Sequence, residues 1–181
     1  SNRASGLHAT VGGGGGNTAG GGGATVDGGE SNEAAGFGAA VGGGDFNYAG
    51  GLYATVPGGY SNLTSGFSSF AAGLRAQALH NGTFVWSSGF GGFPFSSTDS
   101  FQFLISAPGG VGIGTNSPSQ QLEVNGTIYS SFGGFKFPDG TTQTTAGGGG
   151  SFLPLTGGLM TGPITNTGNP AITMGKGNFG A

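Results

Sequence analysis

The side chains that could carry acid–base or metal chemistry are few in this chain of 181 residues. It contains two histidines, His8 and His80, and no cysteine. Its seven carboxylates are Asp27, Glu30, Glu33, Asp45, Asp99, Glu123 and Asp139. A transition-metal site needs several such ligands together, and a nucleophilic serine needs a histidine and an acid beside it. The acids are scattered, and we expect the first four at turns between repeats. We therefore predict no catalytic residues, no metal and no cofactor.

The same scarcity bears on the class of protein. An enzyme carried on a fibre, such as a polysaccharide depolymerase, needs paired carboxylates in a groove. We predict that this chain is not an enzyme. Matches to G-x-G-x-x-G arise easily in a chain with 46 glycines, and none opens a helix after a parallel strand, so we reject nucleotide binding.

Charge and hydropathy exclude several partners. The net charge is −3 with only four basic residues, so a surface for nucleic acid or an acidic membrane has no electrostatic basis. No run of eighteen apolar residues occurs, and we predict no membrane insertion by this segment. The absence of cysteine is compatible with an extracellular bacterial or viral protein. Because the first residue falls inside a repeat, we expect the sequence to be a fragment of a longer chain.

Residues 1–73 are built from a repeated unit of fifteen residues that reads N-x-A-x-G-x-x-A-x-V-x-G-G. Its first position is an asparagine in all five copies: Asn2, Asn17, Asn32, Asn47 and Asn62. A fixed period of this length predicts a solenoid, in which each unit buries its apolar side only by stacking on its neighbours. Inside the unit the small and apolar residues alternate, which predicts two short strands with a turn between them.

The aliphatic column of the repeat should form the interior. It consists of Val11, Val26, Val41, Val56 and Ala71. Burying a valine contributes about 1.5 to 3 kcal/mol, whereas ordering one residue costs about 1 to 2 kcal/mol in backbone entropy. We therefore expect a single stack of coils with so thin an interior to be only marginally stable. Other copies of the chain are the simplest source of a second apolar surface. We predict a homo-oligomer.

The repeat resembles the left-handed β-roll of trimeric autotransporter adhesin heads. In that family small and aliphatic residues line each coil, and three parallel coils pack about a common axis. The resemblance covers residues 1–73 and implies an all-β, fibrous homotrimer with a left-handed β-roll head.

Three further segments follow the head. Residues 74–108 are rich in aromatic residues, and we expect them to form a capping module that closes the roll and widens its core. In residues 109–146, G-V-G-I-G-T, L-E-V-N-G-T-I and K-F-P-D-G-T-T-Q-T-T-A resemble neck and linker sequences of phage tail fibres. Residues 147–181 contain L-P-L-T-G-G-L-M-T-G-P-I, which resembles a tail-fibre shaft and implies a truncated, β-prism-like segment.

The same stretch also matches a cell-wall signal. Residues 153–157 read L-P-L-T-G, as in the L-P-x-T-G motif for covalent attachment to a Gram-positive wall. That motif requires an apolar span and a basic tail after it, and residues 159–181 offer neither. We interpret the stretch as fibre shaft.

One column of large residues could carry recognition. The position after the central glycine of each unit holds Leu7, Gly22, Phe37, Leu52 and Phe67, with His8 and Tyr53 beside it. We expect this column at the bend between the two strands. Two interpretations stay open: packing between neighbouring chains of a trimer, or an exposed strip that contacts a glycan or protein receptor. The candidate receptor-binding residues are Phe37, Leu52, Tyr53 and Phe67.

These features together favour a structural and adhesive role. We predict a segment of a phage tail fibre in the virion, a homotrimer that positions a receptor-binding tip for host attachment. The alternative is a bacterial trimeric surface adhesin, or an extracellular filament subunit, whose β-roll itself binds host or matrix.

Overall fold

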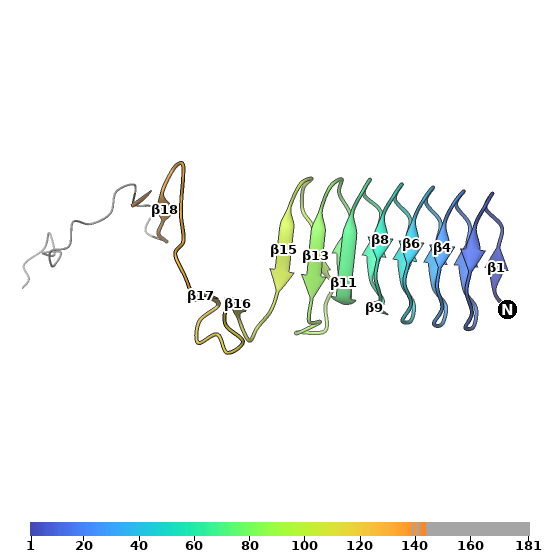
Figure 1. Ribbon diagram of the computed structural model, residues 1–181, viewed down its shortest axis with the longest axis horizontal. Helices are drawn as coiled ribbons and strands as arrows, with labels where there is room; N and C mark the ends of the chain where they lie inside the picture. Colours follow the sequence, from blue (N-terminus) through green and yellow to red (C-terminus); the bar gives the residue numbers. More distant parts are fainter. Residues whose placement is uncertain (139, 141, 144–181) are drawn as a thin grey trace, which may run out of the picture. The chain divides into compact units, whose positions relative to one another are not determined.

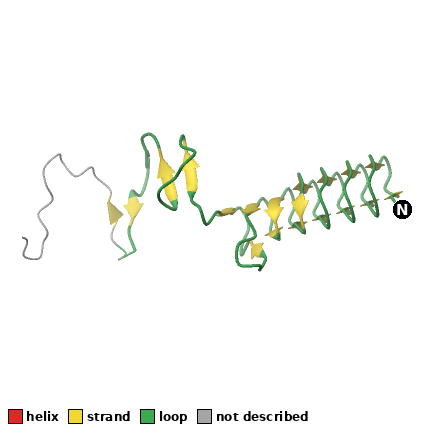
Figure 2. Cartoon of the chain, turned by 90° about the horizontal axis from the view of Figure 1, so that it is seen from below, coloured by secondary structure: helices red, strands yellow, loops and turns green. Residues whose placement is uncertain are grey.

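The computed structural model describes residues 1–138, 140 and 142–143, and these residues form strands and turns without a helix. Most strands belong to two parallel sheets of a β-solenoid, whose successive coils are seen in Figure 1 and, from below, in Figure 2. The first sheet contains β1 (Arg3–Ala4), β3 (Thr18–Ala19), β5 (Glu33–Ala34), β7 (Tyr48–Ala49), β10 (Leu63–Thr64), β12 (Ala76–Ala78) and β14 (Phe95–Ser96). The second contains β2 (Thr10–Val11), β4 (Thr25–Val26), β6 (Ala40–Val41), β8 (Thr55–Val56), β11 (Phe70–Leu74), β13 (Phe84–Ser87) and β15 (Phe103–Ser106), with β9 (Gly59–Tyr60) beside β11.

The strand register confirms the fifteen-residue coil. Thr18 pairs with Glu33, and Glu33 pairs with Tyr48, so each coil stacks on residues one repeat away. Because the coils lie in register, the same repeat position forms a straight column along the solenoid. The predicted all-β repeat fold is therefore confirmed, whereas the handedness of the roll and the trimer stay predictions.

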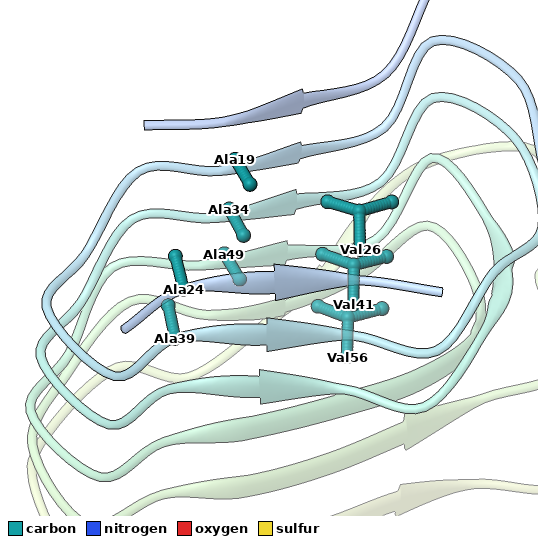
Figure 3. Packing of buried hydrophobic residues seen from close by; sticks show 8 residues of the cluster. All are labelled: Ala19, Ala24, Val26, Ala34, Ala39, Val41, Ala49 and Val56. Carbon is teal, nitrogen blue, oxygen red and sulfur yellow. The ribbon is translucent and has the colours of Figure 1, made fainter. Parts of the chain in front are cut away.

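The interior is as thin as the sequence suggested. Val26, Val41 and Val56 are at most 1% exposed and lie above one another in a column beside columns of buried alanines (Figure 3). Ala71 is also buried. Val11 is only partly buried and packs against this cluster from the first coil.

A ladder of asparagines forms the polar part of the interior. The Oδ1 atom of Asn47 accepts a hydrogen bond of 3.0 Å from the backbone N–H of Asn62. Its Nδ2 group donates to the carbonyls of Gly43 and Gly59, both at 2.9 Å. Asn17 and Asn32 repeat this pattern. Each asparagine thus joins its own glycine turn to the next coil.

The ladder ends where the coil length changes. The Oδ1 atom of Asn62 accepts from the backbone N–H of Ala76, the position that replaces the next asparagine. Phe70 pairs with Phe84 and Phe84 with Phe103, so the last coils span fourteen and then nineteen residues. The glycine-rich loop after β13 accounts for the longer coil.

The aromatic segment extends both sheets. Val85 is fully buried, and Leu104 packs against the same cluster, so these two continue the interior. Phe84 and Trp86 alternate with them and lie on the outer face of β13. The expectation that the aromatic side chains of this segment widen the core is therefore wrong for Trp86 and Phe103, because strand alternation places them outside. Phe95 of β14, by contrast, packs against the buried cluster. Closure of the roll by a cap stays a prediction.

Two small sheets follow. Strands β16 (Val111–Ile113) and β17 (Leu122–Val124) form a parallel pair, and β18 (Phe135–Lys136) pairs with β19 (Thr142–Gln143) in antiparallel fashion. Contacts divide the chain into Ser1–Ile128 and Tyr129–Ala181. Asp139, the end of the neck and the whole predicted shaft with its L-P-L-T-G stretch lie outside the described residues.

Candidate interaction surface

The two histidines lie in different settings. His8 is exposed at a bend and has a positive φ of 60°. His80 is half-buried, and its Nδ1 atom is 2.9 Å from the hydroxyl of Ser97. Across the described part of the chain, no three His, Asp or Glu side chains come close enough to hold a metal ion. The absence of a metal or cofactor stays a prediction.

The first four acids of the chain are exposed, and one of them, Glu33, lies in a strand. Asp27, Glu30 and Asp45 occupy turns or isolated bridges, as expected. The expectation that Glu33 sits in a turn is wrong, since it belongs to β5. The position between the asparagine and the alanine of the repeat points outward from the strand, so a charge there stays in water.

One carboxylate outside the solenoid has a specific partner. Glu123 accepts hydrogen bonds from the backbone N–H of Ser119 at 2.6 Å and from its hydroxyl at 2.8 Å. These bonds favour the ionised form and lower the pKa of Glu123. A shallow cavity of about 200 Å³ lies beside it, lined by Pro108, Gly109, Pro118, Ser119, Gln120 and Gln121. It offers few apolar contacts and is smaller than most ligand pockets.

The structure brings the predicted recognition residues together along one edge. We call this column the bend ridge; it consists of Leu7, Phe37, Leu52, Tyr53 and Phe67. Phe37, Leu52, Tyr53 and Phe67 are each 51 to 56% exposed, and Leu7 is 76% exposed. The Tyr53 ring lies edge to face with Phe37 and with Phe67, with centroids 5.9 Å apart in both pairs. Phe37, Tyr53 and Phe67 therefore form a contiguous aromatic row, and its role in receptor binding stays a prediction.

Local backbone geometry holds these rings in place. Tyr53 has φ 55°, in the left-handed region, and its backbone N–H donates to the carbonyl of Phe37 at 2.9 Å. A Cβ on Gly38 would lie 2.7 Å from Cδ1 of Tyr53, so the ring rests directly on this glycine. Gly22 supports the ring of Phe37 in the same way, because a Cβ on Gly22 would lie 3.1 Å from Cδ2 of Phe37. Glycine in one coil thus makes room for an aromatic ring on the next.

A second aromatic pair lies at the glycine turns and was not singled out from the sequence. Phe46 and Tyr60 are 5.7 Å apart between ring centroids, and both are exposed. Glu30, Asp45 and Tyr60 follow one another in a column of isolated bridges. Phe46 is one position beyond this column, so the fifteen-residue period does not relate the two rings and could not have found the pair.

A further apolar surface lies on the second sheet. We call it the outer aromatic face; its residues are Phe70, Ala72, Phe84, Trp86, Phe103 and Ile105. The rings of Phe70 and Phe84 stack at 4.8 Å with an interplanar angle of 6°, and those of Phe84 and Phe103 at 4.5 Å and 15°. Phe103 is 68% exposed. The density of aromatic residues in this segment was visible in the sequence, but it predicted a core position for them.

Comparisons with protein-family models, with curated proteins and with solved structures gave no match for this chain. The resemblance to adhesin heads and tail fibres therefore stays a prediction. Among the described residues, no helix has the length and apolar character needed to cross a membrane.

Proposed function

We propose that the chain is a structural and adhesive segment of a homotrimeric fibre, most simply a phage tail fibre that holds a receptor-binding tip away from the virion. Its roll would be left-handed, with three parallel copies about a common axis, a capped end, a β neck and a β-prism-like shaft. Its role is mechanical support and contact with a host-surface glycan or protein.

The observation that carries this proposal is that the interior and the surface of the solenoid contain different kinds of side chain. Small residues and asparagines fill the interior, while every phenylalanine and tyrosine of the regular coils lies on the surface. The coils are joined by ladder hydrogen bonds along the whole solenoid, which suits an element under tension. Exposed aromatic residues in such number are unusual for a monomer and typical of surfaces that meet a partner.

The test is the mass of the purified chain in solution, measured by light scattering over a range of concentrations. A homotrimer should have three times the chain mass of 17.4 kDa. A folded protein that stays at 17.4 kDa at every concentration would refute the fibre assignment. Antibodies against the chain should then label tail fibres in virions from the source organism.

The alternative is a bacterial surface adhesin or extracellular filament subunit in which the roll itself binds host or matrix. The bend ridge favours this alternative, because its rings are exposed, continuous and held by the backbone. Antibody labelling of the bacterial envelope, with virions unlabelled, would favour the adhesin over the tail fibre. Loss of adhesion in a Phe37→Ser, Phe67→Ser double variant that keeps its mass would place the contact on the bend ridge.

A further inference from the structure

The outer aromatic face has no partner within the described part of the chain. Register pairs Phe70 with Phe84 and Phe103 in one column, and Ala72 with Trp86 and Ile105 in the next. Both columns point away from the buried residues of the same strands. Three stacked strands therefore present a two-column apolar surface to solvent.

This surface is preorganised. The stacked rings are held at 4.5 to 4.8 Å by the strand spacing, so their side-chain freedom is already reduced before any partner binds. Trp86 is 36% exposed and Ile105 is 37% exposed, although they lie in the middle of regular strands. Aromatic residues in such rigid arrays are typical of the centre of a protein interface.

The chemistry of the face restricts its occupant. None of its six residues is charged, and only the indole N–H of Trp86 can donate a hydrogen bond. The face-to-face stacking of the phenylalanines covers most of their ring faces, so few remain on which a sugar could lie. A glycan would therefore find few polar partners here, unlike on the turns that carry Glu30 and Asp45.

A second copy of the chain meets these restrictions. Two copies carry the same net charge of −3, so they can approach closely only where charges are absent. A copy also carries an apolar face of the same length and spacing. We propose that copies of this chain meet on the outer aromatic face, with Trp86 and Ile105 near the centre of the contact. This rests on the proposed assembly and specifies where it forms.

The chain supplies its own reporter, since Trp86 is its only tryptophan. The full chain is diluted in steps, and at each step the mass is followed by light scattering and Trp86 by emission maximum and acrylamide quenching. We expect the mass to fall as Trp86 emission shifts to longer wavelength and quenching becomes faster, with one midpoint for all three signals.

A matched pair of variants locates the contact. Ile105→Glu puts a charge beside Trp86 on an outward position, and should raise the dissociation midpoint by at least about tenfold, since an unpaired charge is costly to desolvate. Leu52→Glu puts the same charge on the bend ridge and should leave the midpoint within about twofold. Circular dichroism checks that both variants keep their strands.

The outcomes separate this inference from the proposed function. A mass that falls on dilution while Trp86 quenching stays unchanged would overturn the inference and leave the fibre proposal intact. Dissociation of the assembly by Leu52→Glu but not by Ile105→Glu would overturn it in the same way. A chain that is monomeric throughout would refute both. The wild-type dilution series tests the inference even if a variant does not fold.

Discussion

The coils of residues 1–66 and those of residues 67–106 share an interior and differ in their surface. Both bury small residues on the same inward positions, such as Val41 in the first region and Val85 in the second. On the outward positions of the second sheet, the first region has Thr10, Thr25, Ala40 and Thr55, and the second has Phe70, Phe84 and Phe103. The interior sets the path of the chain, and the outside is free to vary with function.

The two regions also differ in which side chains form hydrogen bonds with the backbone N–H and C=O groups. In the first, an asparagine in every coil links turn to turn. In the second, the hydroxyl of Ser69 donates to the carbonyl of Gly66, and that of Thr83 donates to the carbonyl of His80. Links between coils come from Asn81, whose Oδ1 accepts from the N–H of Phe67, and from Ser97, whose hydroxyl oxygen accepts from the N–H of Leu79. No buried side-chain N or O atom in the described residues lacks a partner. One repeated asparagine position thus links the regular coils, whereas different side chains form these links where the coil length varies.

The largest expected effect comes from a charged side chain placed on the inward face of a strand, which tests whether that face forms the interior. Val41→Asp should abolish folding, because burial of an unpaired carboxylate costs several kcal/mol. Ala40→Asp, the matched control, places the same charge on the outer face of β6 and should remain folded. Thermal unfolding followed by circular dichroism checks both, and equal melting of the two variants would contradict the inward assignment.

The asparagine ladder gives the next largest effect. Asn47→Ala removes the acceptor for the N–H of Asn62 and the donor for two glycine carbonyls, so we expect a loss of about 3 kcal/mol or more, at about 1 to 3 kcal/mol for each buried group left unpaired. Tyr48→Ala, one residue away on the exposed side of β7, should cost less than about 1 kcal/mol. Denaturant unfolding measures both. Similar losses in the two variants would show that the ladder does not stabilise the first region.

Neighbouring coils approach closely at some glycines and not at others, so replacing two glycines by alanine should change stability differently. The expected effect is smaller than that of Asn47→Ala. A Cβ on Gly51 would lie 2.0 Å from the carbonyl oxygen of Gly66, so Gly51→Ala should destabilise the protein by about 1 to 3 kcal/mol through a forced backbone shift. Gly28 has no atom within 4 Å of its Cβ position, and Gly28→Ala should be neutral or stabilise by up to about 1 kcal/mol. The melting temperatures of the two variants test this. A lower melting temperature for Gly28→Ala than for Gly51→Ala would refute the close stacking of coils at Gly51.

The smallest effect lies outside the solenoid, at Glu123. Because its pKa is lowered in the folded protein, its hydrogen bonds to Ser119 contribute stability above the ordinary carboxyl pKa, and this contribution is lost as pH falls through the lowered value. A carboxyl-detected NMR titration should give a midpoint for Glu123 below the ordinary value of a glutamate side chain. Ser119→Ala removes the hydroxyl bond but keeps the stronger backbone bond, so it should raise the midpoint only in part. An unchanged midpoint would mean that the hydroxyl bond is absent in solution.

Periodicity alone determined the fold of the first region. A repeat of fifteen residues, alternation within each unit and glycine pairs between units define coils, strands and turns, because each of these patterns is local and recurs in register. The inward places of Val26, Val41 and Val56 and the bend position of Phe37, Tyr53 and Phe67 follow directly from counting. The asparagine column was visible too, but its partners were not, since for Asn17, Asn32 and Asn47 they lie on glycines four residues before and twelve residues after the asparagine.

The tertiary structure alone decided where the aromatic segment points. In the sequence a dense run of phenylalanines is compatible with a large core, and nothing local distinguishes the two faces of β13 and β15. Only the register with β11 fixes which residues continue the buried column, because one residue of slip would exchange Phe84 for Val85. The stacked rings of Phe70, Phe84 and Phe103 come from three different coils, and their alignment exists only once the coils are in register.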